Sequence, residues 1–323
     1  MPISTKKENA TRVWNPDEIG TKPKTLRSLS LDAIGVIAHH HAPSARALIR
    51  SRLAAVGPFE VSETGDSTQL LAALSDATKP VHLLVGEPRN DVIELIRDVR
   101  RARTAADPFI NVLVLTPSAE PEFIRRLIDA GVDGILSVPF SVQEIETRLS
   151  DCVVRRRKFV AAFDYVGPDR RSGERKDSPS ARAIDPFNPA LAAGMGLSDA
   201  VVAKERAAAA DRLRTLRSAC LAAHALRELV ALGVARNDAR AGDVSADPTA
   251  KRVVVAMRGL IELDRMVGKR LDSERRADLS NLLRLIEPAE AEEIDDEGML
   301  NALRRARALV AVFDGPNAEL VAP

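Results

Sequence analysis

The chain has 323 residues, of which 45% are hydrophobic and 29% are charged, and its formal net charge is +1. This composition is ordinary for a globular protein with enough apolar residues for two domain cores. The balanced charge excludes a global electrostatic attraction to nucleic acid or to a membrane. Aromatic residues make up only 3% of the chain, which disfavours a base-stacking surface for single-stranded nucleic acid.

The sequence also bears on the compartment of the protein. No apolar run approaches the ~18 residues that a membrane span requires, and the segment from Met1 to Lys7 lacks the apolar core of a signal peptide. Cys152 and Cys220 fall in different predicted helices and indicate no disulfide framework. We therefore expect a cytoplasmic protein without membrane insertion.

Residues 1–30 are polar, contain several lysines and prolines, and show little apolar periodicity. This pattern predicts a flexible N-terminal tail. Trp14 is the only tryptophan of the chain and has two interpretations. It could anchor a partner or the chain's own surface, since buried aromatic residues are frequent hot spots, or it could have no role within a disordered segment.

Between residues 31 and 154, short apolar stretches alternate with amphipathic ones. The predicted strands are 33–38, 59–63, 81–85, 112–115 and 135–138, and the predicted helices are 44–56, 67–74, 90–101, 121–130 and 142–153. Short apolar strands between amphipathic helices are typical of a parallel sheet with helices on both faces. The pattern predicts an α/β, flavodoxin-like doubly wound sheet.

Four motifs in this region carry a family resemblance. They are His40-His-Ala-Pro-Ser-Ala-Arg, Asn111-Val-Leu-Val-Leu-Thr-Pro, Ala130-Gly-Val-Asp-Gly-Ile-Leu-Ser and Val138-Pro-Phe-Ser. Together with the strand–helix rhythm, they resemble the CheY-like receiver domain of bacterial response regulators. In that family two acidic residues after the first strand hold Mg²⁺, an aspartate at the end of the third strand takes the phosphate, and a lysine precedes the Pro-Phe pair.

Most of these reactive residues are replaced in this chain. The acidic pair falls on His40 and His41, the phosphate acceptor on Gly86 and the lysine on Val138. A shift of one residue would make Glu87 the acceptor candidate, where it could at most mimic a charged state. Two features are kept: Thr116 matches the switch hydroxyl of the family, and Pro139 is expected to follow a cis peptide bond, as in relatives.

This replacement predicts a degenerate pocket that cannot be phosphorylated. Mg²⁺ needs hard oxygen ligands, which neutral imidazoles and a glycine do not supply. Phosphoryl transfer relies on the metal and on a cation to neutralise the developing charge. We therefore expect a pseudo-receiver with no catalytic residues and no cofactor, which is not an enzyme.

Three consecutive histidines, His39 to His41, follow the first predicted strand at the sheet edge where such folds bind ligands. Imidazole suits zinc or copper. However, adjacent residues of an extended chain point to opposite sides, so we expect no metal site here and instead a pH-sensitive or solvated loop.

Residues 155–197 are expected to be a basic, proline-rich linker without regular elements. Six arginines of this segment are the candidate partner-binding residues: Arg155, Arg156, Arg157, Arg170, Arg171 and Arg175. They could contact an anion, such as an acidic partner surface or a nucleotide, or they could pack on the receiver and on helix ends. The Gly167-Pro-Asp-Arg-Arg stretch has no chemistry that the sequence assigns.

Residues 198–315 have a helical pattern, followed by a short tail at 316–323. The predicted helices run from 198 to about 234, and over 248–271, 273–286 and 297–313, and their short connections predict an antiparallel bundle. His224 loosely resembles a phosphotransfer histidine, but it shares a stripe with Leu213, Leu216 and Cys220 and is expected to face the core.

These features predict a non-catalytic bacterial signalling adaptor that acts by protein–protein interaction. The expected partner is a protein of a phosphorelay or of a motility or envelope assembly, bound at residues 122–153 and the basic linker; this surface is implied by the receiver resemblance. The long first helix could instead pair in a homodimer, although no heptad pattern runs beyond about two repeats. The alternative is a nucleic-acid-binding regulator that uses the linker or the bundle, but no basic helix-turn-helix is present in the sequence.

Overall fold

The computed structural model describes residues 23–76, 81–170 and 182–240, together with residues 261, 264, 273, 276, 277 and 279–281. Five parallel strands form its main sheet in the order β2-β1-β3-β4-β5. They are β1 (Gly35–His39), β2 (Glu60–Thr64), β3 (Leu83–Gly86), β4 (Asn111–Thr116) and β5 (Gly134–Ser137). This is the flavodoxin-like order that CheY shares, so the predicted receiver fold is confirmed.

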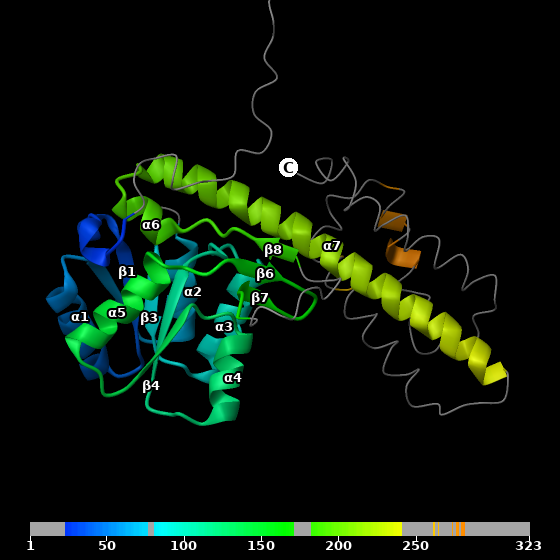
Figure 1. The fold of residues 1–323 in the computed structure, drawn as a ribbon, viewed down its shortest axis with the longest axis horizontal. Coiled ribbons are helices and arrows are strands. Elements are labelled where there is room, and N and C mark those ends of the chain that lie inside the picture. Colours follow the sequence, from blue (N-terminus) through cyan, green and yellow to red (C-terminus); the bar gives the residue numbers. More distant parts are fainter. Residues whose placement is uncertain are drawn as a thin grey trace, which may run out of the picture.

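Helices cover both faces of this sheet, as Figure 1 shows. One layer holds α1 (Pro43–Val56) and α5 (Val142–Val153), and the other holds α2 (Ser67–Ser75), α3 (Asn90–Arg100) and α4 (Pro121–Asp129). Every residue of β4 is buried because alternate side chains serve the two layers: Leu113 packs with α1 and α5, and Val112 with α2, α3 and α4. The apolar runs therefore predicted the five strands of this sheet correctly.

The N-terminal residues that the structure describes are packed, so the predicted flexible tail is wrong for residues 26–30. Two short 3₁₀ helices, Leu26–Ser28 and Leu31–Ala33, precede β1. Leu26 and Leu29 are buried in the core that α1 and α5 share, and Arg27 pairs with Glu146 at 2.6 Å. Leucines at this spacing provide enough apolar surface to dock the segment. Trp14 lies outside the described residues.

The predicted linker is also wrong in part, because it contains a second sheet. Strands β6 (Phe159–Ala161), β7 (Val166–Pro168) and β8 (Arg182–Ile184) pair antiparallel in the order β7-β6-β8, and α6 (Pro189–Gly194) follows. We call the three strands the small sheet. Phe159, Val166 and Phe187 belong to a third core, which also includes residues of the long helix that begins at Asp199. Pro168 is tolerated because β7 is an edge strand.

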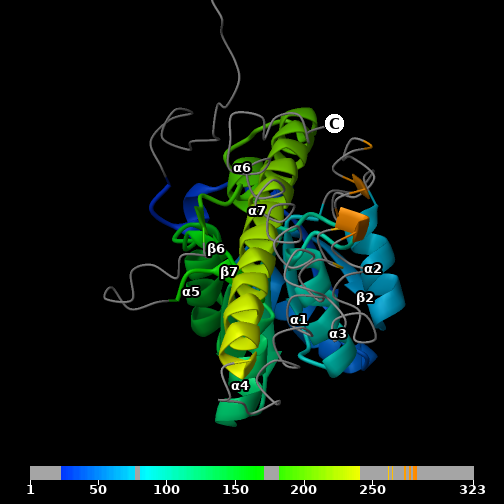
Figure 2. The same ribbon diagram turned by 90° about the vertical axis from the view of Figure 1, so that its right-hand side faces the viewer.

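The long helix α7 (Asp199–Arg240) confirms a helical C-terminal region and extends six residues beyond the predicted end. Its first half packs on the small sheet through buried Val202, Ala209 and Leu213, and its far half extends away from both sheets (Figures 1 and 2). The ring of His224 stacks on Phe163 with centroids 3.9 Å apart, in agreement with a core-facing histidine. The predicted bundle of further helices lies largely outside the described residues.

Two findings concern the cysteines and the membrane. Cys152 and Cys220 are both buried, and no disulfide joins them. Within the ranges that the structure describes, no helix is both long enough and apolar enough to cross a lipid bilayer.

The Tyr165–Arg170 segment attaches the small sheet to the receiver domain. Gly131, at the end of α4, has a φ of +84°, and a Cβ there would overlap the carbonyl oxygen of Val166. A Cβ at Gly167 would lie 2.7 Å from the Cα of Gly131, so both glycines are needed for this close approach. Arg170 donates to the carbonyl of Val132 at 2.8 Å. The stretch without an assigned chemistry therefore has a packing role.

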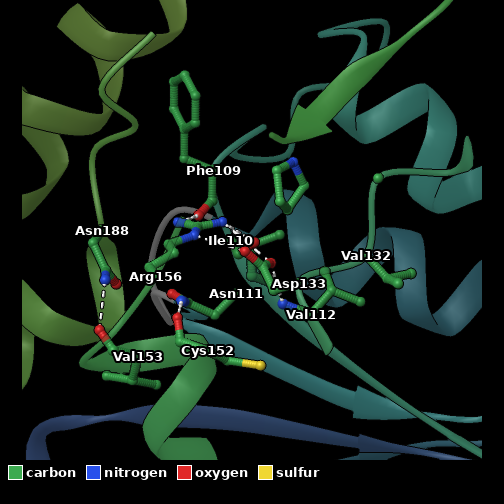
Figure 3. A network of polar contacts seen from close by, with 12 residues as sticks. Phe109, Ile110, Asn111, Val112, Val132, Asp133, Cys152, Val153, Arg156 and Asn188 are labelled. Carbon is green, nitrogen blue, oxygen red and sulfur yellow. Dashed lines mark hydrogen bonds and ion pairs between the residues drawn. The ribbon is translucent and has the colours of Figure 1, made fainter. Parts of the chain in front are cut away.

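A buried charge network fixes the same junction (Figure 3). The Asp133 carboxylate accepts from Arg100 at 2.7 Å and from Arg156 at 2.7 Å, and all three side chains are at most 4% exposed. Both guanidinium groups also lie over the ring of Phe159. Burial lowers the pKa of Arg100 and the Asp133 charge opposes that shift, so Asp133 neutralises charge where solvent cannot.

Two buried asparagines satisfy the last carbonyls of α5, which helix geometry leaves without intrahelical partners. The Asn111 side chain donates to Cys152 O at 2.6 Å, and the Asn188 side chain donates to Val153 O at 2.7 Å (Figure 3). The end of α5 is thereby fixed directly before the arginine run.

Candidate functional site

The carboxyl ends of the parallel strands meet at one edge of the main sheet. His39 ends β1 next to Gly86 at the end of β3, and Thr116 ends β4 next to Ser137 at the end of β5. This edge is where folds of this kind bind ligands. The structure therefore brings together the positions that the sequence analysis assigned to a degenerate phosphorylation pocket.

A cavity of about 360 Å³ lies at this edge. Its lining includes four predicted site residues: His40, Glu87, Thr116 and Val138. The sequence analysis missed the apolar side chains that line most of the rest, including Leu48, Phe123 and Phe140. Only their positions within a few residues of the predicted ends of strands and starts of helices could have indicated them. The lining contains one carboxylate, that of Glu87, and one guanidinium group, that of Arg89, and is otherwise largely apolar.

Gly86 leaves no room for an acceptor side chain without a local adjustment. A Cβ at Gly86 would lie 3.1 Å from the Cβ of His39. The His39 ring is buried, and its Nδ1 lies 2.9 Å from the hydroxyl of Thr64. Burial lowers the pKa of His39, which favours the neutral ring. The glycine and the buried histidine thus form a packed pair at the acceptor position.

The two features that match the receiver family are present in the structure. Thr116 is fully buried, and its hydroxyl oxygen accepts the backbone N–H of Ser118 at 3.0 Å. The Val138–Pro139 peptide bond is cis, as the resemblance implied. Val138, at the position of the family's lysine, presents a side chain that is 39% exposed and carries no charge.

His40 and His41 lie side by side, contrary to the expectation that consecutive histidines diverge. Their rings stack with centroids 4.5 Å apart and an interplanar angle of 23°. The expectation failed because β1 ends at His39, so the backbone is no longer extended at these two residues. Glu87 joins them: its Oε2 lies 2.8 Å from Nδ1 of His41 and 3.8 Å from Nδ1 of His40.

The pKa values of this group follow from partial burial and mutual contact. Burial raises the pKa of Glu87, but the hydrogen bonds from the ring and backbone N–H of His41 and the charge interactions with the two imidazoles together outweigh it, so the pKa is lowered overall. Burial lowers the pKa of His40 more than the Glu87 charge raises it. The expected state near neutral pH is a carboxylate held by the His41 backbone and ring, beside a neutral His40.

Donor atoms of His40, His41 and Glu87 all lie within 4.8 Å of one another, which raises the question of a metal. One carboxylate does not meet the oxygen-ligand requirement of Mg²⁺. A transition metal would suit imidazole, but an ion bound to both rings must lie near both ring planes, and stacked rings have nearly parallel planes. In addition, Nδ1 of His40 already accepts the N–H of Ala42. As arranged, these residues do not fit a metal ion.

The candidate partner-binding arginines have different environments. Arg156 is buried in the Asp133 network, so its role is structural. Arg170 is partly buried on carbonyl oxygens of the receiver domain, while Arg155 and Arg157 are exposed at the end of α5. Arg171 and Arg175 lie outside the described residues.

The α4–β5–α5 face, residues 122–153, is the surface that the receiver resemblance assigned to a partner. β5 is an edge strand of the main sheet, with Ser137 exposed. Arg125 on α4 and Thr147 on α5 are exposed on either side of it. The face is therefore accessible among the residues that the structure describes.

No family model matches the chain, and no curated protein matches it. Similar solved structures include chemotaxis protein CheY4 of Vibrio cholerae, with 22% identity over 37% of this chain and 98% of that chain and a TM-score of 0.33. A candidate pilus assembly-related protein of Burkholderia pseudomallei has 17% identity over 38% and 90% of the two chains, with a TM-score of 0.34. The receiver domain of a Pseudomonas aeruginosa sensor histidine kinase has 16% identity over 37% and 96%, with a TM-score of 0.33. We base the fold assignment on the strand order and not on these values.

Proposed function

We propose that this protein is a pseudo-receiver that is not phosphorylated and that acts as a non-catalytic adaptor in bacterial signalling. The observation that carries the proposal is the composition of the strand-end pocket. Gly86 stands at the acceptor position, Val138 at the position of the lysine, and the single carboxylate of Glu87 is engaged by His41. The pocket thus lacks the oxygen ligands that Mg²⁺ needs and a lysine to neutralise the transferred phosphoryl group, and the cation that does line it, Arg89, is exposed and pairs with Asp91 at 3.6 Å.

The proposed docking surface is the α4–β5–α5 face, and the proposed partner is a protein of a two-component pathway or of a motility or envelope assembly in the cytoplasm. Three features support this surface. It includes an edge strand, its residues Arg125, Ser137 and Thr147 are exposed, and its α4 and α5 residues are not part of the core that packs α7 on the small sheet. Pairing of two copies through the same face would give a homodimer.

Acetyl phosphate with Mg²⁺ is expected to leave the full chain unlabelled, as measured by intact-protein mass spectrometry. Gly86→Asp is the matched variant: it restores a carboxylate but is expected to stay unlabelled as well, because the metal ligands and the lysine are still missing. Stoichiometric labelling of the natural sequence that disappears in Glu87→Ala would overturn the proposal.

A photo-crosslinking amino acid placed at Arg125 or Thr147 of the full chain is expected to capture a specific partner in the cells that make the protein. The control positions are Thr68 and Ala72, exposed on α2 at the opposite edge of the main sheet. A crosslink between two copies would identify the face as a homodimer contact. Equal crosslinking from both pairs of positions, or from the control pair alone, would contradict the proposed face.

A further inference from the structure

A second cavity, of about 440 Å³, lies where the receiver domain meets the small sheet. Its lining comes from α4, from the edge strand β5, from the end of α5 with the residues that follow it, and from β7 with Arg170. We call it the arginine cavity. It is separate from the strand-end pocket, with which it shares one lining element, α4, and its volume is within the range of ligand pockets, roughly 300–1,000 Å³.

The arginine cavity has a large excess of positive charge. Five arginines and two aspartates line it, which leaves three uncompensated positive charges. One aspartate, Asp133, is already shared by Arg100 and Arg156 in the buried network. The other, Asp151, pairs with Arg155 at 2.6 Å and only distantly with Arg148, at 3.9 Å.

Two of the remaining guanidinium groups have no carboxylate partner among the described residues. Arg170 donates to the carbonyl oxygens of Val132 and Asp133 through Nη2 and also interacts with the side chain of Tyr165, while its buried Nε has no hydrogen-bond partner there. Arg157 is exposed and forms no ion pair within the described ranges. Like charges 4 Å apart repel by about 1 kcal/mol even in water, and more strongly in a recess. A bound polyanion would relieve this repulsion.

The shape and chemistry of the lining restrict what that anion is. Guanidinium groups bind phosphate oxygens in bidentate fashion and also stack on flat rings. Ile128, Ile135 and Pro168 also line the cavity and form an apolar wall. An inorganic anion would make no favourable contact with this wall. The residues that follow, 171–181, contain three basic and two acidic side chains, so this segment has no excess negative charge with which to neutralise the cavity.

We infer that the arginine cavity binds a nucleotide with at least two phosphate groups. The phosphates contact Arg155, Arg157 and Arg170, and the nucleoside lies against the apolar wall. The cavity is lined by parts of α4, β5 and α5, which also form the proposed docking face, but the inference does not depend on the adaptor function because nucleotide binding is measured without a partner. Nucleotide binding would also explain why Arg155 and Arg157 follow α5, since neither belongs to the buried Asp133 network.

Isothermal titration of the full chain at 0.15 M salt tests the inference, with ADP and GDP as probes and with pyrophosphate and adenosine as partial ligands. The double variant Arg155→Glu, Arg157→Glu is expected to weaken nucleotide binding by at least tenfold, or about 1.4 kcal/mol. The control Lys24→Glu, Arg50→Glu changes the net charge equally at exposed positions outside the cavity. It is expected to leave binding within about twofold, since distant surface charges are screened.

Four outcomes would overturn the inference. They are no binding of either nucleotide, equal loss in both double variants, binding of pyrophosphate as tight as that of ADP and GDP, and a shift of duplex DNA that is lost only in Arg155→Glu, Arg157→Glu while nucleotides do not bind. Unchanged thermal unfolding of the variants shows that any loss is local, because both substituted arginines are exposed.

Discussion

Asp133→Asn is expected to lower the free energy of unfolding by about 3–5 kcal/mol, the cost of breaking a buried ion pair by removing one partner. The substitution keeps the shape of the side chain and removes its charge. Arg100 and Arg156 would then be two buried guanidinium groups next to each other, with carbonyl oxygens as their main remaining acceptors. Urea unfolding followed by circular dichroism measures the change.

The matched control is Asp151→Asn, which removes a carboxylate that is 42% exposed from Arg155 and Arg148 in the last turn of α5. Exposed ion pairs contribute about 0–1 kcal/mol, so a small loss is expected. A loss in Asp133→Asn no larger than in this control would show that carbonyl oxygens alone can hold the two guanidinium groups. The junction would then not depend on charge neutralisation.

Gly131→Ala is the second substitution with a large expected effect. The added methyl group would overlap the carbonyl oxygen of Val166 and approach Arg100, so the small sheet would have to move away from the receiver domain. Overpacking of this kind costs about 1–3 kcal/mol, in addition to about 1–2 kcal/mol for an alanine in the left-handed region. Thermal or urea unfolding of the full chain measures the total loss.

Gly196→Ala separates the two contributions, because Gly196 has almost the same φ, +83°, but nothing lies within 4 Å of its would-be Cβ. The loss of stability in Gly196→Ala should therefore equal the backbone contribution alone, about 1–2 kcal/mol. Similar losses in the two variants would mean that the contact between Gly131 and β7 is not tight, and that the small sheet is attached mainly by the Asp133 network.

The small sheet and the Asp133 network show why the linker prediction failed. Strands of three residues, such as Phe159–Ala161 and Val166–Pro168, are too short to display a period in the sequence. Proline and glycine in this segment indicate turns in most contexts, yet Gly167 and Pro168 are suited to an edge strand in close contact with Gly131. That contact joins residues that are distant in the sequence.

The candidate site was likewise predicted only in part from the sequence. The positions of His40, Glu87, Thr116 and Val138 around one cavity follow from parallel strands, whose carboxyl ends meet at one edge. The side-chain arrangement did not follow. His40 and His41 stack because the chain bends where β1 ends, and Arg156 turns inward because Asp133 lies where both guanidinium groups can reach it.

The sequence by itself determined the five-stranded doubly wound sheet, the strand-end location of the pocket and the residue types found there, such as Glu87, Thr116 and Val138. Apolar periodicity and residue type are local properties, and each can be read one segment at a time. Only the tertiary structure decided which arginines are buried and which surround a charged cavity, and that the segment after α5 folds onto the receiver domain. Those outcomes depend on charges and close backbone contacts between segments far apart in the chain, where burial changes the strength of every interaction.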